Sequence, residues 1–455
     1  MSPVWARGIL GNGVTVCVVD DGLDYNHPDL KENFASFVSY DFNSKRPLPT
    51  PMLADDVHGT RCAGEIAASA WDGFCGVGVA PLARVGGVRI LSGPLFDYTE
   101  AAALRMGLED GKTDISSNSW GPSDDGKTAE KPGPMMLDAL VEGVTKGRKG
   151  LGIIYVFASG NGGSVDDCAF DGYVSNIYTI GIGALGRGGD IPYYQEPCAS
   201  RLAVVYSSNT RDFITTTDVY GKCTSRHSGT SAAAPLAAGI IALLLQARPE
   251  LTWRDVQHLI IRSAITVRPD DKGWITNSAG LRFHIYYGFG RIDADALVTL
   301  GQNWALVPEQ TTIELKSNAT FQTIANYDLA TIDCAFGGDN FHLEHVIARV
   351  SIHHPRRGDL AYDLQSPAGT WSRLASPRRN DRSPGDLKDW DFVTVAFWGE
   401  QALGTWTLEI TDTSPMVCFF FIFFYFLFFI FLIFFLIFFS FIWRKKKRRN
   451  NTLRQ

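Results

Sequence analysis

Apolar residues follow two different patterns along the chain, one on each side of about residue 302. In the first part, apolar runs of strand length alternate with glycine-rich turns and amphipathic helices. The runs at residues 14–19 and 152–158 are almost continuously apolar, which is typical of strands in a parallel sheet covered on both faces. Helices are predicted at residues 58–69, 100–110, 135–146 and 231–247. The first part is therefore predicted to be an α/β fold, with functional groups at the carboxyl ends of its strands.

The helical period disappears beyond Trp304. Short stretches in which apolar and polar residues alternate take its place, at residues 345–352, 359–364, 392–397 and 405–410. Such alternation indicates half-buried strands of antiparallel sheets. We expect a second domain, a small β-sandwich, at residues 303–415.

The last 40 residues differ in composition from the rest of the chain. Of the 29 phenylalanines, 14 lie between Phe419 and Phe441. The uncharged run 416–439 would be about 36 Å long as a helix, enough to cross a hydrocarbon core of roughly 30 Å. Basic residues follow at once, as is typical of a cytoplasmic flank. Two interpretations stay open: a transmembrane helix at 416–443 with a basic tail at 444–455, or an artefact in which a T-rich intron is translated.

The formal net charge of the whole chain is −6, but the chain before residue 416, here called the body, is more acidic. Residues 416–455 hold seven Lys or Arg and no acid, so residues 1–415 carry a net charge of −13. An acidic body of this size disfavours nucleic acid as a partner and favours cationic ligands or metal ions.

Three polar residues with complementary chemistry stand at the ends of predicted elements: Asp20, His58 and Ser231. A serine nucleophile needs a base to take its proton and a carboxylate to hold that base in the right tautomer. The tetrahedral oxyanion also needs a fixed donor, and Asn161, which follows the predicted strand 152–158, has suitable chemistry. Each motif alone is explained as well by a turn, a helix start or an N-cap. Their joint occurrence is far less expected by chance.

These four motifs resemble those of the subtilase superfamily, family S8. The surrounding sequence resembles the kexin and furin branch of that family, the proprotein convertases, over nearly all of residues 4–302. The segments that carry the resemblance lie at residues 58–65, 119–122, 125–128 and 251–258. The segments 231–239 and 350–358 resemble the type 7 convertase most, and the β-rich region from 303 resembles the family's P domain.

The resemblance implies a subtilisin-like catalytic domain at residues 1–302, with a parallel sheet flanked by helices. An all-β, jelly-roll-like P domain is expected to follow at 303–415. The implied activity is that of a calcium-dependent serine endopeptidase that processes proproteins after paired or clustered basic residues. Its implied partners are proprotein substrates with basic cleavage sites and its own prodomain.

The family pattern also assigns acidic residues to the substrate-binding subsites. Asp124 and Asp171 match the pocket for a P1 arginine, Asp21 and Asp55 match the P2 site, and Glu100 and Glu130 match the P4 side. The other residues assigned to substrate binding are Ser119, Trp120 and Gly121. A guanidinium in a desolvated carboxylate pocket gains charge-assisted hydrogen bonds, so lysine at P1 is expected to bind less well.

Two calcium sites are implied, and oxygen ligands suit this hard cation. The first set is Asp29 and Asp72 with carbonyls at Ser69, Phe74 and Gly76. The second set, beside the P1 pocket, is Asp124, Asp166 and Glu196. At a third family site only Asp41 is kept, next to the basic pair Lys45 and Arg46, so this site is expected to be absent or altered.

The family's disulfides match Cys75 with Cys223 and Cys168 with Cys198, and such bonds need an oxidising compartment. Asn318 is the only glycosylation sequon before the Phe-rich run. The resemblance therefore implies a membrane of the secretory pathway, in the Golgi or trans-Golgi network, with a lumenal catalytic domain.

Some features depart from the family. No signal peptide or prodomain precedes the catalytic domain, and the P-domain resemblance ends at about Asp412. We therefore expect both domains to be truncated, and an inactive or misfolded convertase fragment is the alternative to an active enzyme. The tripeptide at 357–359, Arg-Gly-Asp, is one that some adhesion receptors read, but the pattern favours a turn of the β-sandwich.

Overall fold

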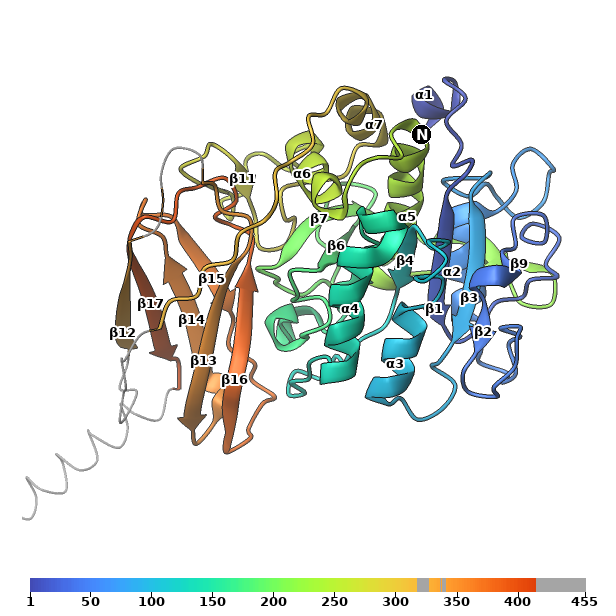
Figure 1. Cartoon of the computed structure of the whole chain (residues 1–455). Helices are drawn as coiled ribbons and strands as arrows, with labels where there is room; N and C mark the ends of the chain where they lie inside the picture. The colour runs from blue at the N-terminus through green and yellow to red at the C-terminus, as the bar shows by residue number, and fades with distance from the viewer. Residues whose placement is uncertain (317–326, 336, 338–340, 415–455) are drawn as a thin grey trace, which may run out of the picture.

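The computed structural model describes residues 1–316, 327–335, 337 and 341–414 (Figure 1). The predicted glycosylation site Asn318, the predicted membrane span at 416–443 and the basic tail at 444–455 lie outside these residues. Among the helices that the structure describes, α5 (Thr230–Ala247) is the one long and apolar enough to cross a membrane, and 78% of it is buried inside the protein. It is the central helix of the core.

The first part of the chain forms a parallel seven-stranded sheet in the order β2-β3-β1-β4-β5-β6-β7. The strands are β1 (Thr15–Asp20), β2 (Tyr40–Asp41), β3 (Arg84–Arg89), β4 (Ile115–Asn118), β5 (Ile154–Ala158), β6 (Thr179–Leu185) and β7 (Arg201–Tyr206). Along β1, Val16 and Val18 face one hydrophobic core, whereas Cys17 and Val19 face another. The sheet is therefore buried on both faces, and the predicted α/β architecture is confirmed.

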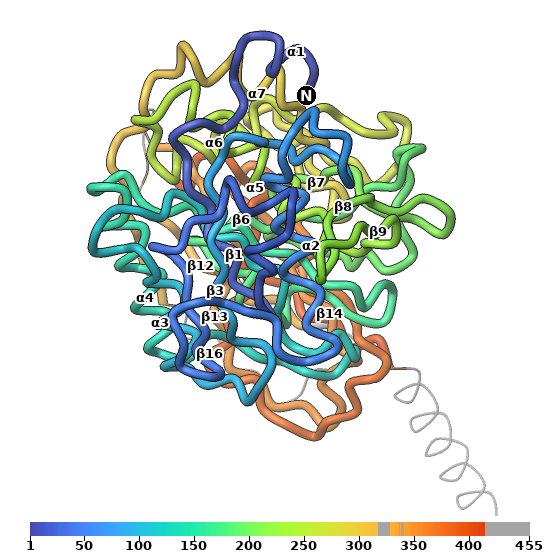
Figure 2. The backbone as a smooth tube through the Cα atoms, turned by 90° about the vertical axis from the view of Figure 1, so that its right-hand side faces the viewer, coloured from blue at the N-terminus to red at the C-terminus, as the bar shows by residue number. Residues whose placement is uncertain are grey.

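The two cores are closed by different helices. Helices α2 (His58–Ala67), α5, α6 (Trp253–Ser263) and α7 (Ala294–Gln302) supply the first core. Helices α3 (Asp97–Leu104) and α4 (Pro134–Lys146) supply the second, and Figure 1 shows these two together on one side of the sheet. The short α1 (Ser2–Trp5) lies beside α7 in Figure 2.

All four predicted helices form, with shifted ends, and α6 and α7 add to them. Helix α3 ends six residues before the predicted limit because the chain turns at Gly107, whose φ is +72°. Helix α6 begins with a capping box in which Thr252 and Asp255 bond each other's backbone amides. Helix α7 is N-capped by Asp293, whose side chain accepts the amide of Ala296. The start of α6 could have been predicted from the Thr-x-x-Asp spacing at 252–255, which is typical of a capping box.

The second part of the chain is a β-sandwich. One sheet has the order β12-β17-β14-β15, and the other pairs β13 with β16, all antiparallel. The strands are β12 (Tyr327–Cys334), β13 (Val346–His354), β14 (Leu360–Gln365), β15 (Trp371–Ala375), β16 (Gly385–Thr394) and β17 (Gly404–Asp412). Leu364, Phe392 and Trp406, from both sheets, share one core. Strand β17 lies between two neighbours, so the last described strand is an interior one.

One predicted strand is wrong at its end, and the difference explains how the domains join. The run 392–397 was expected to be a strand, but β16 ends at Thr394. Val395, Ala396 and Trp398 leave the sandwich and enter the core around α5. An alternating apolar pattern does not distinguish burial within one domain from burial against another.

The exchange of side chains between the domains is mutual. Phe170, from the first domain, belongs to the sandwich core and packs against Trp390 and Phe392. Backbone carbonyls of Ala396 and Trp398 accept hydrogen bonds from the Asn277 side chain at 3.0 and 2.9 Å. Each domain therefore contributes side chains to the core of the other, so each domain alone would expose apolar residues to water.

Replacing Trp398 by Ala is expected to lower the free energy of unfolding by about 3–5 kcal/mol, because this fully buried ring fills the interdomain core. Urea denaturation followed by fluorescence and circular dichroism measures the change. Trp371→Ala is the matched control, since that ring is 41% exposed on an edge strand. Equal effects of the two substitutions would contradict a shared core.

Candidate active site

The three residues predicted to be catalytic stand on three elements that meet at one edge of the sheet. Asp20 is the last residue of β1, His58 is the first residue of α2, and Ser231 is the second residue of α5. Both carboxylate oxygens of Asp20 lie 2.9 Å from Nδ1 of His58. Asp20 is 1% exposed, so its charge acts on the imidazole with little screening by water.

The ion pair sets the proton affinity of His58. Burial lowers the pKa of His58, but the charge of Asp20 and its hydrogen bond raise it more, so the pKa lies well above its usual value. Because Asp20 holds Nδ1, the other ring nitrogen, Nε2, is left to exchange a proton with a neighbouring group.

Ser231 is held close to His58 by a shared neighbour. The sulfur of Cys62, one turn along α2, lies 3.9 Å from Nδ1 of His58 and 3.7 Å from the carbonyl oxygen of Ser231. The hydroxyl of Ser119 donates to the same carbonyl at 3.0 Å. Among the described residues the Ser231 hydroxyl makes no hydrogen bond and is partly exposed, which leaves it available to a substrate.

Asn161 is oriented so that its amide nitrogen is the free end of the side chain. Its Oδ1 accepts hydrogen bonds from the backbone amide of Thr230 at 2.8 Å and from the Thr230 hydroxyl at 3.0 Å. Since only an oxygen can accept an N–H, this identifies which atom is which. The Nδ2 group is therefore a fixed donor beside the N-terminus of α5.

The sequence did not predict the buried pair of His227 and Glu65, which lies behind the predicted catalytic residue His58. His227 Nδ1 lies 2.9 Å from Glu65 Oε1, and the His227 ring is edge-on to His58 with 5.3 Å between ring centres. Burial raises the pKa of Glu65 well above its usual range. Burial and the charge of His58 lower the pKa of His227 to about 3. A protonated Glu65 therefore donates to a neutral His227, which adds no second positive charge beside His58.

The predicted P1 acids lie next to the strand segment assigned to substrate binding. A Cβ atom at Gly121 would lie 2.8 Å from Oδ2 of Asp171, so the missing side chain leaves room at this carboxylate. Burial raises the pKa of Asp171 to about 7, and the charges of Asp124 and Asp166 add to the effect. Trp120 is buried against Phe157 and Tyr173 and forms the apolar side of this region.

The two predicted P4 acids differ in exposure. Glu100 is buried and its Oε1 accepts the hydroxyl proton of Tyr173 at 3.1 Å. Burial raises the pKa of Glu100, and Glu130 is one of the charges that raise it further. Glu130 is exposed and its backbone forms a bridge with Asp171. The structure thus brings one predicted P1 acid, Asp171, and the two predicted P4 acids together around Tyr173.

The two predicted P2 acids are not equivalent. Asp21 is buried, and its two oxygens accept the backbone amides of His58 and Gly59 at 2.9 and 2.7 Å. It therefore caps α2 and fixes the start of the helix that carries the base. Burial and the charge of Asp20 raise the pKa of Asp21 to about 6. Asp55 is exposed, so its carboxylate is the one open to a ligand.

The first predicted calcium set contains a buried carboxylate whose surroundings suit a cation. Asp29 is fully buried, and neither of its carboxylate oxygens has a hydrogen-bond partner among the described residues. Burial and the nearby Asp72 carboxylate raise the pKa of Asp29 to about 7. Ser69 donates its amide to the carbonyl of Asp29, and Asp72 accepts the amide of Phe74. A divalent cation at these oxygens would satisfy the buried charge, so the residues fit calcium.

The second predicted set lies against Asn161, the predicted oxyanion donor. The backbone amide of Asn161 donates to Asp124 at 2.9 Å, and that of Gly162 donates to Glu196 at 2.7 Å. Burial raises the pKa of Glu196 well above its usual range, and the charges of Asp166 and Asp124 raise it further. Asp166 also accepts a hydrogen bond from Arg378 at 3.2 Å, but one guanidinium does not balance three carboxylates that repel one another, so this set also fits calcium.

At the third family site, the side chain of Arg89 lies beside the one acid that the sequence keeps, Asp41. Arg89 is 2% exposed and lies between two carboxylates, 3.2 Å from Asp41 and 2.8 Å from Asp56. The only acid that the sequence keeps for this site therefore already has a cationic partner, which supports the prediction that the site is altered. Asp56 and Arg89 were not singled out from the sequence.

One group in the described part of the chain has three ligand atoms within 4.8 Å of one another: His58, Cys62 and His227. Nitrogen and sulfur donors do not suit calcium, and both Nδ1 atoms are already bonded to carboxylates. This group is therefore not a candidate calcium site.

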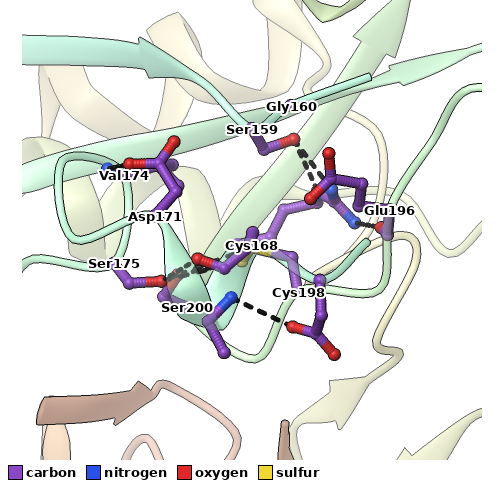
Figure 3. The surroundings of a disulfide bond; sticks show 12 residues. Ser159, Gly160, Cys168, Asp171, Val174, Ser175, Glu196, Cys198 and Ser200 are labelled. Atoms are coloured by element: carbon purple, nitrogen blue, oxygen red, sulfur yellow. Dashed lines mark hydrogen bonds between the residues drawn. A yellow bond between two sulfur atoms is a disulfide. The ribbon is translucent and has the colours of Figure 1, made fainter. Parts of the chain in front are cut away.

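Both predicted disulfides are present, Cys75–Cys223 and Cys168–Cys198. The first ties the loop of Asp72 to β9 (Lys222–His227). The second lies between Asp171 and Glu196, as Figure 3 shows, and joins the segments that carry them. Each bond therefore fixes a loop of predicted ligands.

Comparison with known proteins agrees with this geometry. The pattern described as "Subtilase family" matches residues 11–290, and that described as "Proprotein convertase P-domain" matches residues 343–418. The chain belongs to the subtilase family. The predicted recognition and fold class are confirmed, with relatives in the kexin and proprotein convertase branch.

The subtilase relatives cover both domains. A PC3-like endoprotease variant B of Hydra vulgaris is 47% identical over 425 residues, which are 90% of this chain and 59% of the relative. Protease KEX1 of Kluyveromyces lactis is 46% identical over 418 residues, 90% and 55% of the two chains. The crystal structure of a serine protease of Aeromonas sobria has a TM-score of 0.80 at 27% identity, covering 90% of this chain and 83% of that one. The chain thus spans about half the length of the curated relatives it matches, and the resemblance to type 7 stays a prediction.

Asp20→Asn is expected to lower the pKa of His58, because it removes the charge that raises this pKa and leaves the opposing effect of burial. NMR titration of histidine ring carbons measures the shift. Asp218→Asn is the control, since Asp218 pairs with Arg61 on the same helix but does not contact the imidazole. An unchanged His58 pKa in the Asp20 variant would show that the ion pair does not set it.

Proposed function

We propose that this subtilase is a serine endopeptidase that processes proproteins by cleaving after paired or clustered basic residues. The observation that carries the proposal is the hydrogen-bonded Asp20–His58 pair beside Ser231 at the start of α5. The acids around the P1 region and the convertase relatives support the basic specificity.

The residues divide the chemistry among them. The hydroxyl oxygen of Ser231 attacks the carbonyl carbon of the scissile bond while Nε2 of His58 takes its proton. Asp20 keeps the proton on Nδ1 and stabilises the imidazolium that forms. Nδ2 of Asn161 donates to the oxyanion, a donor worth about 2.7–4 kcal/mol in such sites. His58 then gives its proton to the leaving amine, and water releases the acyl group by the same steps.

Specificity for basic residues is supported by the acids around the P1 region. Asp171 is partly buried and its pKa is raised, so a guanidinium that bonds to it also neutralises a partly desolvated charge. Arginine presents a planar fork with several donors, whereas lysine presents one ammonium. The P1 site is therefore proposed to prefer arginine.

Calcium is the proposed cofactor at the two fitting sets. Asp29 and Asp72 would hold one ion, with carbonyls from Ser69, Phe74 and Gly76. Asp124, Asp166 and Glu196 would hold the second. A bound cation would neutralise these carboxylates and fix the loops that carry Asn161 and the P1 acids.

The compartment is proposed to be the lumen of the secretory pathway, in the Golgi or trans-Golgi network. Two disulfides support an oxidising environment. A prodomain and proprotein substrates are the proposed partners. Membrane attachment through residues 416–443 stays a prediction, since those residues lie outside the described part.

The proposal predicts that the chain cleaves a peptide with an Arg-X-Lys-Arg site and leaves its alanine-substituted version intact. Ser231→Ala is expected to abolish cleavage, and Asn161→Ala to lower kcat about 10²–10³-fold by removing one oxyanion donor. Mass spectrometry of the products gives both the site and the rate. Equal cleavage of the two peptides would refute basic specificity, and no cleavage of either would favour the inactive-fragment alternative.

Removing calcium is expected to lower the melting temperature, and Asp29→Asn to reduce the stabilisation that added calcium gives. A cation must displace the proton from a carboxyl whose pKa is about 7, so calcium should stabilise more at pH 7.5 than at pH 5.5. Thermal unfolding with and without calcium at both pH values tests this. Asp295→Asn, an exposed acid paired with Arg7, is the control and should respond like the parent chain. A calcium effect of the same size in the Asp29 variant would exclude this site.

A further inference from the structure

A loop of the β-sandwich, between β15 and β16, lies against the two segments that carry the P1 acids. Its central residue is Arg378, which is 1% exposed although it belongs to the second domain. The guanidinium lies 3.6 Å from the centre of the Phe170 ring and 3.2 Å from a carboxylate oxygen of Asp166. A buried arginine is rare unless its charge is paired, and both terminal nitrogens of Arg378 have hydrogen-bond partners, although its Nε has none in the described part of the chain.

The same loop bonds the backbone of the segment between Asp124 and Glu130. Arg378 donates to the carbonyl oxygens of Thr128 and Lys127. Asn380 donates to the carbonyl of Asp125 at 3.2 Å. Three carbonyls of a segment that belongs to the first domain are thus satisfied by side chains of the second.

The Arg-Gly-Asp tripeptide has its place in this arrangement. Arg357 donates to the carbonyl of Lys127 at 2.9 Å and pairs with Asp381 at 2.7 Å. Asp381 also holds the guanidinium of Arg378 at 2.7 Å. A Cβ atom at Gly358 would lie 2.1 Å from the carbonyl oxygen of Arg378, so only glycine fits there. Because Arg357 makes these two bonds, the tripeptide helps to hold Arg378 in position and is not an exposed recognition loop.

On the other side of Arg378, Asp166 connects the loop to the substrate region. Its second carboxylate oxygen accepts the amide of Gly126 at 2.7 Å. The next residue, Asp167, accepts the amide of Ser376 from the sandwich loop at 2.7 Å. The segment at 166–167 is therefore held between the P1 region and the second domain.

We propose that Arg378 is a specificity-positioning residue, through which the β-sandwich domain holds the acids of the P1 pocket in the geometry that binds arginine. It does not touch the substrate. It bonds the backbone carbonyls of Lys127 and Thr128, in the segment that begins with Asp124, and the carboxylate of Asp166, so the second domain sets substrate affinity as well as stability. This inference rests on the proposed function of the pocket.

A second arginine at the domain interface provides a matched control. Arg254 on α6 pairs with Glu344 of the second domain, and their side chains are 12% and 9% exposed. This pair makes no contact with the residues assigned to the P1 pocket. If the interface contributed stability alone, Arg254→Gln and Arg378→Gln would have the same effects on activity.

The test is to measure kcat and KM of the full chain on two peptides that differ only in Arg or Lys at P1. For Arg378→Gln we expect KM for the P1-arginine peptide to rise about tenfold, with kcat changed by less than about twofold, so that the preference for arginine falls. Arg378→Lys keeps the charge without the fork and should lie between. Arg254→Gln should lower the melting temperature and leave the preference unchanged.

Equal changes of the preference in the two Gln variants, or an unchanged KM in Arg378→Gln, would overturn the proposal. If Arg378→Gln does not fold, Asn380→Ala decides in its place: a raised KM for the P1-arginine peptide supports the proposal, and an unchanged KM overturns it. If the parent chain cleaves neither peptide, the proposed function fails separately. Binding of the P1-arginine peptide to Ser231→Ala chains with and without Arg378→Gln then decides, and equal affinities overturn the inference.

Discussion

Burying a carboxylate costs free energy unless another group compensates its charge, and this constraint organises the functional half of the protein. Asp20 is compensated by His58, which makes the imidazole a strong base at the right place. Asp21 is compensated by two backbone amides, which fixes the helix that begins with that histidine. Asp20 and Asp21 are thus neighbouring buried carboxylates whose charges are compensated in two different ways, by an imidazole and by backbone amides.

Other buried acids are compensated in other ways, and each way has a different consequence. Asp56 shares the buried Arg89, which leaves no charge for a cation at the third family site. Glu65 keeps its proton and bonds the neutral His227, so no second positive charge lies beside His58. Asp29 has no partner in the described chain, which makes it a place where a cation would stabilise the fold.

The same constraint joins the two domains. Asp166 receives a buried guanidinium from the β-sandwich, and in return Phe170 enters the core of that domain. The residues after β16 fill the core around α5. An interface with interlocked cores and buried ion pairs differs from the loose contact usual between domains, and it is the basis of the proposal that the second domain positions the P1 acids.

The sequence by itself determined the architecture and the chemistry. Period and turn signals are local, so they revealed the parallel sheet, the sandwich and the polar residues at the element ends, and the motifs around Asp20, His58, Asn161 and Ser231 indicated the family. Only the tertiary structure decided which acids are free to bind a ligand and which are already paired. The pairing of Arg89 with Asp56 and of Arg378 with Asp166 carries no local signal, because the partners lie 33 and 212 residues apart along the chain. Long-range compensation of charge is a property of the packed chain, and a pattern of neighbours in sequence does not contain it.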